Sequence, residues 1–164
     1  GEPGARGCTE IARRILCAAP DTRHVLLPVG TGTTLAGLVA ALDADRRVTG
    51  ISALKGAHDT EARVQSLLDS MAVTKGARWE VLHAFHCGGF ARVSAQLKAF
   101  IKHFEQIQGV PLDPVYTAKT LFALYQLRAG GTWPADEPVL VVHTGGLQGR
   151  RGYAWLQPDS TGQL

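Results

Sequence analysis

The hydrophobic positions of the chain alternate between short continuous runs and stripes at helical spacing. Short runs are typical of buried strands, whereas apolar residues at i, i+3, i+4 and i+7 are typical of amphipathic helices. The runs predict strands over residues 24–29, 48–53, 79–85 and 139–142. The stripes predict helices over residues 9–19, 35–42, 64–71, 93–107 and 114–129, the last with Asp113 as N-cap and Pro114 at its first position.

Strands and helices alternate in this order, which favours an α/β fold built on a parallel sheet. Residues 24–53 form one compact strand–helix–strand unit, and we expect its crossover to be right-handed. We therefore predict an open, mostly parallel sheet with helices on both faces. A length of 164 residues suits one domain. We assign residues 1–156 to a single α/β domain and residues 157–164 to a polar tail.

Composition narrows the classes of partner. The chain is 45% hydrophobic and 19% charged, so it can bury a core, and its net charge of +3 with 7% aromatic residues disfavours a nucleic-acid partner. No apolar run reaches the roughly 18 residues that a membrane span requires. The three cysteines lack CxxC spacing and the histidines lack HExxH spacing, so we expect no metal site. A reducing, cytoplasmic location agrees with this cysteine pattern.

A glycine- and threonine-rich loop joins the first predicted strand to the next helix. It reads Gly30-Thr31-Gly32-Thr33-Thr34. Unpaired N–H groups at a helix start attract anions, and glycine allows a phosphate to approach the backbone closely. The loop lacks the lysine of a P-loop and does not match GxGxxG. Two interpretations stay open here: a phosphate-binding loop, or an ordinary turn with a threonine cap.

Two further residues could face a ligand at the C-terminal edge of the sheet, where α/β proteins bind their ligands. Tyr116 lies in the first turn of the last predicted helix, and Thr144 lies in the loop 143–146 after the last predicted strand. The simpler alternatives stay open: Tyr116 as a surface or half-buried residue, and Thr144 as part of an ordinary turn. His86 and Cys87 are a weaker candidate for a nucleophile pair, because adjacent side chains usually point apart.

Together, three segments carry a family resemblance. GTGTTLAGL, GVPLDPVYTAK and VVHTGGLQG resemble the pyridoxal-phosphate enzymes of the 1-aminocyclopropane-1-carboxylate deaminase and D-cysteine desulfhydrase family, which have the tryptophan-synthase β-like fold (fold type II). The opening segment GARGCTEIARRI is also similar to the helix that follows a glycine-rich loop in that family. The resemblance extends from about residue 4 to residue 150. It implies pyridoxal 5′-phosphate as cofactor and a homodimer that acts on a small amino acid.

The resemblance also implies residue roles. Thr144 would hydrogen-bond the pyridine nitrogen, and Tyr116 would face the substrate as acid, base or nucleophile. Deaminases of the family carry an acid directly after this tyrosine, where this chain has Thr117. That difference favours desulfhydrase-like β-elimination over cyclopropane ring opening. The cofactor phosphate would be bound by the loop residues Gly30, Thr31, Gly32, Thr33 and Thr34.

The family's Schiff-base lysine lies in an N-terminal region that no segment of this chain matches. Lys55 and Lys119 stand in other contexts, where structural or solvated roles fit better. We therefore interpret the chain as the C-terminal half of a family member, a portion of its large cofactor-binding domain, whose missing N-terminal half is a partner. We expect the chain alone to be inactive. Two alternatives stay open: a phosphate- or nucleotide-binding module, and a non-catalytic remnant that pairs with another chain through an exposed sheet edge.

Overall fold

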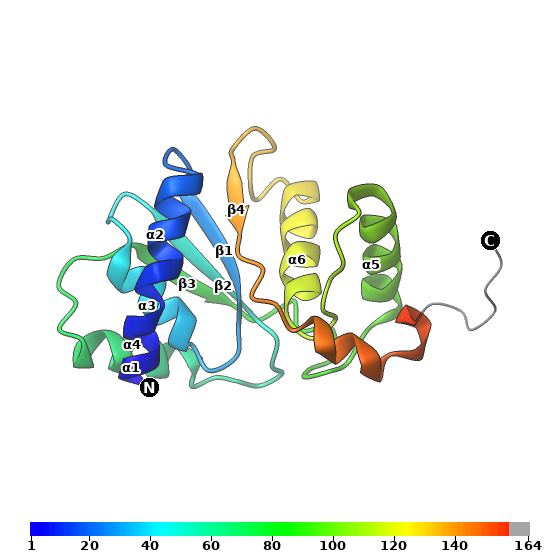
Figure 1. Cartoon of the computed structure of the whole chain (residues 1–164), viewed down its shortest axis with the longest axis horizontal. Coiled ribbons are helices and arrows are strands. Elements are labelled where there is room, and N and C mark those ends of the chain that lie inside the picture. Colours follow the sequence, from blue (N-terminus) through cyan, green and yellow to red (C-terminus); the bar gives the residue numbers. More distant parts are fainter. Residues whose placement is uncertain (158–164) are drawn as a thin grey trace.

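The computed structural model describes residues 1–157, and in this part of the chain four strands form one sheet (Figure 1). The strands are in the order β3-β2-β1-β4, and each neighbouring pair is parallel. They are β1 (His24–Val29), β2 (Arg47–Ser52), β3 (Arg78–Leu82) and β4 (Val139–Val141). The predicted parallel α/β sheet is therefore confirmed.

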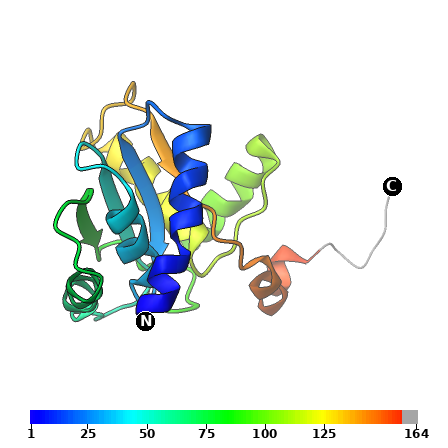
Figure 2. The ribbon, with the colours of Figure 1, turned by 60° about the vertical axis from the view of Figure 1, so that its left-hand side comes forward.

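Helices cover both faces of the sheet, as predicted. One face packs against α1 (Glu2–Gly7), α2 (Thr9–Ala18), α3 (Thr33–Ala41) and α4 (Thr60–Ser70). The other face packs against α6 (Thr117–Ala129), and α5 (Ala95–Gln108) packs on α6. In Figure 2 the blue helices α1 and α2 lie in front of β1, whereas the yellow helix α6 lies behind the sheet.

The central strand β1 is buried along its whole length. Its side chains alternate between the two faces, as a strand requires. Val25, Leu27 and Val29 belong to the core under α1 to α4, whereas Leu26 packs with Leu124 of α6. Burial on both faces explains why this strand reads as a continuous apolar run instead of an alternating one.

The start of α6 differs from the prediction. Asp113 and Pro114 were expected to cap and open this helix, but α6 begins at Thr117 after a turn. The carboxylate of the buried Asp113 accepts hydrogen bonds from the N–H groups of this turn, at 2.8–3.1 Å: Val115, Tyr116 and Thr117. Asp113 therefore caps the turn before the helix, and Tyr116 becomes the N-cap residue.

The hydrophobic pattern did not predict the helix α1, because its sequence EPGARG has no helical periodicity. Tertiary packing accounts for it. A Cβ atom added to Gly37 of α3 would lie 2.3 Å from the carbonyl oxygen of Ala5 and 2.6 Å from the Cβ of Cys8. The missing side chain of Gly37 therefore allows α1 to pack directly on α3.

After β4 the chain forms two short 3-10 helices, η1 (Leu147–Gly152) and η2 (Ala154–Leu156). The predicted polar tail begins at Gln157, whose side-chain amide nitrogen, Nε2, donates to the carbonyl oxygen of Arg150 at 2.9 Å. The rest of that tail, residues 158–164, lies outside the described residues. Over residues 1–157, no helix combines the length and the apolar character needed to cross a membrane.

The contact at Gly37 yields a test of the fold. Because there is no space for a methyl group between α1 and α3, Gly37→Ala should lower the free energy of unfolding by about 1–3 kcal/mol. Gly7→Ala is the matched control, since its added Cβ would meet nothing within 4 Å; it should be neutral or stabilising by up to about 1 kcal/mol. Urea unfolding followed by circular dichroism measures both. Equal effects of the two substitutions would contradict the packing argument.

A buried histidine lies at the N-terminal end of β1. His24 is 4% exposed, its Nε2 lies 3.0 Å from the hydroxyl of Thr49, and its ring centroid lies 4.3 Å from that of Trp133. Burial lowers the pKa of His24 below its ordinary value of 6.5, and the neighbouring Arg47 lowers it further, whereas Glu137 and Glu80 act in the opposite direction. The folded state therefore favours the neutral ring.

This lowered pKa makes stability depend on pH. Below about pH 6.5 the unfolded chain binds a proton at His24 that the folded chain resists, so stability falls as the pH falls below that value. Urea midpoints measured at pH 7.5 and pH 5 should differ less in His24→Gln than in the wild type. His103→Gln removes an exposed histidine and should keep the wild-type difference. A His24→Gln variant with the full wild-type pH dependence would refute this assignment.

Candidate functional site

A cleft of about 350 Å³ opens at the C-terminal edge of the sheet. The chain runs from β1 through β2 to β3 on one side of β1 and then returns to the other side with β4. The loops after β1 and β4 therefore diverge at this point, which is the usual ligand position in such sheets. The cleft is lined by Pro28, Gly30, Thr31, Thr34, Leu54, Arg63, Tyr116 and Thr144.

The predicted phosphate loop borders both this cleft and a smaller hollow of about 40 Å³, which residues 28–35 line. Gly32 is the N-cap of α3 and has a φ of +86°. Its added Cβ would lie 2.6 Å from Cγ2 of Val64, so both backbone and packing require glycine here. The hydroxyls of Thr31 and Thr33 lie 3.1 Å apart. The free N–H groups of the first turn of α3 give the hollow a partial positive charge.

Tyr116 lies directly over this loop. A Cβ atom added to Gly30 would lie 3.6 Å from Cε1 of Tyr116 and 3.7 Å from its phenolic oxygen. On its other side, the ring of Phe90 meets Tyr116 edge-on, with the centroids 6.1 Å apart. The structure therefore brings Tyr116 and the glycine loop together, although they are far apart in the sequence.

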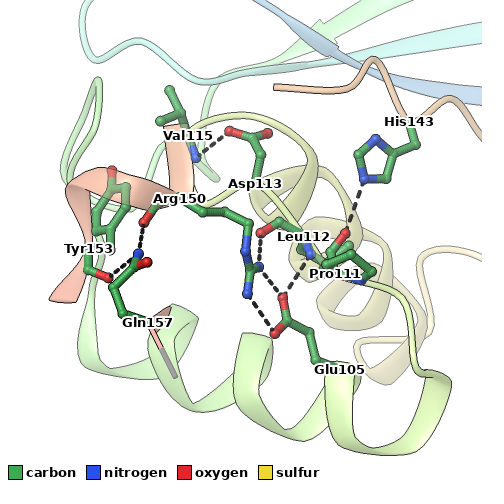
Figure 3. Close-up of polar contacts among 9 residues, drawn as sticks. All are labelled: Glu105, Pro111, Leu112, Asp113, Val115, His143, Arg150, Tyr153 and Gln157. Atoms are coloured by element: carbon green, nitrogen blue, oxygen red, sulfur yellow. Dashed lines mark hydrogen bonds and ion pairs between the residues drawn. The ribbon is translucent and has the colours of Figure 1, made fainter. Parts of the chain in front are cut away.

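Thr144 is exposed to the same cleft from the loop after β4. His143 holds this loop: its Nε2 donates to the carbonyl oxygen of Pro111 at 3.2 Å (Figure 3), and its Nδ1 accepts from the N–H of Gly145 at 3.1 Å. Gly146 has a φ of +79°, and its added Cβ would lie 3.4 Å from Cγ of Asp113. The Thr144 loop thus packs against the turn that precedes Tyr116.

An ion pair also fixes the turn that precedes Tyr116, on the side away from the Thr144 loop (Figure 3). Arg150 of η1 forms a bidentate pair with Glu105 of α5. Glu105 accepts the N–H of Leu112 at 2.7 Å, and Arg150 donates to the carbonyl oxygen of Leu112 at 2.6 Å. Both polar groups of Leu112 are therefore fixed immediately before Asp113. Sequence reasoning did not find this pair, because its members are distant and match no motif.

The other candidates from the sequence do not reach the cleft. Lys119 is fully buried, and its Nζ donates to the carbonyl oxygen of Gly89 at 2.7 Å. Burial lowers the pKa of Lys119 and raises that of the Cys87 thiol. His86 accepts the N–H of Gly88 through Nδ1, and Lys55 is exposed. Lys119 therefore has a structural contact, and the arrangement gives Cys87 no activation as a nucleophile.

Besides Pro28 at the end of β1, two residues that sequence reasoning missed also line the cleft. Leu54 follows β2, and Arg63 projects from the first half of α4. Neither stands in a recognisable motif, so only the folding of α4 against the loop could have revealed them. Within residues 1–157, no three histidine, cysteine or acidic side chains are placed to hold a metal ion.

A larger cavity of about 500 Å³ lies between α5, α6 and β4. This cavity is lined mainly by leucine, valine and aromatic side chains, whereas the cleft presents three threonine hydroxyls and the backbone of a glycine. We therefore place the candidate site in the smaller cleft. The lining residues of the larger cavity are Phe104, Gln108, Leu121, Leu124, Tyr125, Arg128, Val139 and Val141.

Comparison with curated proteins gives relatives of two activities. The chain is 31% identical over 151 residues to a putative 1-aminocyclopropane-1-carboxylate deaminase of Pyrococcus abyssi, covering 88% of this chain and 45% of the relative. It is 27% identical over 153 residues to a D-cysteine desulfhydrase of Klebsiella pneumoniae, covering 87% of this chain and 47% of the relative. The chain thus spans less than half the length of these relatives.

Comparison with solved structures confirms the fold. The crystal structure of an ACC deaminase homologue superposes with a TM-score of 0.78 at 24% identity, covering 92% of this chain and 48% of the other. The sequence profile described as "Pyridoxal-phosphate dependent enzyme" matches residues 3–145, a range that includes the glycine loop, Tyr116 and Thr144. The resemblance of the three motifs is thereby confirmed, and the chain belongs to the family of pyridoxal-phosphate-dependent enzymes.

Proposed function

We propose that this chain forms the cofactor-binding part of a pyridoxal-phosphate-dependent lyase or deaminase that acts on a small amino acid. One observation carries the proposal: three segments that are distant in the sequence supply the loop, Tyr116 and Thr144 to one cleft. Its volume of about 350 Å³ lies within the range of about 300–1,000 Å³ that is usual for small-molecule sites.

The residues present suit the phosphate end of the cofactor. The hollow at the N-terminus of α3 offers backbone N–H groups, and the positive φ of Gly32 gives the loop the conformation that forms it. The hydroxyl of Thr34 borders both the hollow and the cleft. In this proposal Gly30, Thr31, Gly32, Thr33 and Thr34 bind the phosphate.

The side of the cleft formed by the Thr144 loop suits the pyridine ring of the cofactor. Thr144 would hydrogen-bond the pyridine nitrogen from the loop that His143 holds in place. A hydroxyl does not keep that nitrogen protonated as a carboxylate would. When bound, pyridoxal phosphate withdraws electrons from the bonds at the α-carbon of an amino acid, and Thr144 sets a moderate strength for this effect.

Tyr116 is the side chain that we assign to proton movement at the substrate, through its phenolic oxygen.

Thr117, the residue after Tyr116, supports β-elimination, as in D-cysteine desulfhydrase, over ring opening. Thr117 is fully buried, and its hydroxyl has no hydrogen-bond partner among the described residues. A carboxylate at this position would lose its hydration without a partner, which is costly. The acid that ring-opening relatives carry after the tyrosine therefore has no counterpart here.

The covalent anchor of the cofactor is a lysine that we assign to a segment outside this chain. Lys119 is directed to Gly89 and Lys55 is exposed, so neither suits that role. A module that binds only phosphate or a nucleotide is the alternative, and it would show no preference for pyridoxal phosphate over inorganic phosphate.

The phosphate site can be tested through the hydroxyl of Thr34. Thr34→Val keeps the shape of the side chain and removes a donor, so it should weaken the binding of pyridoxal phosphate and of inorganic phosphate about tenfold, as expected for one hydrogen bond to a charged group. Equilibrium dialysis of the chain against each ligand measures this. Thr132→Val, at an exposed position near the opposite edge of the sheet, should bind as the wild type does. Unchanged affinity in Thr34→Val would remove this residue from the site.

The role of Tyr116 can be tested in the enzyme that contains this chain. Tyr116→Phe removes only the hydroxyl, so the packing over Gly30 should survive while turnover falls roughly 100-fold or more. Cofactor affinity should change little. The assays are release of pyruvate and ammonia from D-cysteine and ring opening of 1-aminocyclopropane-1-carboxylate. Wild-type turnover on the accepted substrate would reduce Tyr116 to a packing residue.

A further inference from the structure

The phosphate loop itself carries no positive side chain. Residues 28–35 contain neither lysine nor arginine, so any positive charge for a phosphate must come from another element. Among the described residues that line the cleft, Arg63 is the one cationic side chain. It comes from α4, the helix that follows β2.

The packing of α4 places Arg63 at the phosphate end of the cleft. A Cβ atom added to Gly32 would lie 2.6 Å from Cγ2 of Val64 and 3.9 Å from the carbonyl oxygen of Thr60. The turn of α4 that carries Arg63 therefore contacts the N-cap of α3. Thr144, in contrast, enters the cleft from the loop after β4, on the other side of β1.

The guanidinium group of Arg63 is incompletely paired within the protein. Its Nε is buried and has no hydrogen-bond partner among the described residues. Its Nη2 donates to the hydroxyl of Thr60 at 3.3 Å and lies 3.4 Å from Oδ1 of Asp59, and both contacts are long. Since guanidinium has five donors, this group can bind a phosphate without losing a strong contact.

We propose that Arg63 binds the phosphate group of pyridoxal phosphate together with the Gly30–Thr34 loop, an inference that rests on the function proposed above. Arginine matches phosphate geometry through two parallel N–H donors. In this arrangement the loop supplies backbone dipoles and α4 supplies the full charge.

The test compares Arg63→Gln with the wild-type chain by equilibrium dialysis against inorganic phosphate, pyridoxal phosphate and pyridoxal. We expect phosphate and pyridoxal phosphate to bind about tenfold or more weakly in the variant, with pyridoxal unaffected. Arg47→Gln is the matched control, since Arg47 is an exposed arginine at the start of β2, and it should bind as the wild type does. Circular dichroism checks that each variant is folded.

Three outcomes would overturn the proposal, and they separate its failure from that of the proposed function. If Arg63→Gln and the wild type bind phosphate equally, Arg63 is not a ligand while the loop site stands. If the variant loses pyridoxal as strongly as phosphate, Arg63 acts through the shape of the cleft. If the wild-type chain binds neither phosphate nor pyridoxal phosphate, the proposed function fails with it.

A second measurement needs no variant and covers the case in which Arg63→Gln does not fold. Phenylglyoxal modifies accessible arginines, and peptide mass spectrometry reports the rate at each one. In the wild-type chain, inorganic phosphate should slow the modification of Arg63 severalfold relative to chloride at equal ionic strength, while the rate at Arg47 stays constant. Equal rates at Arg63 in the two salts would refute the contact.

Discussion

The position of β1 between β2 and β4 is the constraint on which the ligand-binding edge depends. This strand is buried along its whole length and pairs with a strand on each edge, so its buried backbone N–H and C=O groups depend on both neighbours. Because β2 and β4 pair with it in parallel, the loops after all three strands emerge at one edge. Gly30 and Thr144 can share a cleft only in this arrangement.

The segments that form the cleft are loops, yet backbone contacts hold them. The turn before Tyr116 is fixed by Asp113 from within and by the Glu105–Arg150 pair through Leu112 from outside. This pair is mostly buried and bidentate, and such pairs fix geometry better than single exposed contacts do. The site therefore combines open backbone, which a ligand needs, with fixed positions, which catalysis needs.

The sequence predicted the local features well and the long-range ones poorly. All four strands were predicted; the continuous apolar run of β1 reflects its complete burial, whereas the edge strands β3 and β4 are only partly buried. The motifs identified the glycine loop, Tyr116 and Thr144 as candidates without showing that they lie close together. The predicted start of α6 was wrong because Asp113 caps a turn in place of a helix, and the hydrophobic pattern missed α1 because its close packing on α3 at Gly37 is a contact between distant residues. Arg63 and the buried amine of Lys119 carry no local signal, since their roles depend on which distant backbone they face.

The pairing of β1 with β4 also sets an order in which the site can form during folding. The loop, α3 and β2 adjoin β1 in the sequence, so the phosphate hollow depends on local contacts that form quickly. The strand β4 comes last among the strands, and its docking closes a long loop, which costs more entropy and is slower. The hollow can therefore exist in a chain that still lacks the Thr144 side of the cleft. A ligand that contacts both Gly30 and Thr144 stabilises only the chain in which β4 has docked, so its binding reports the completion of the fold.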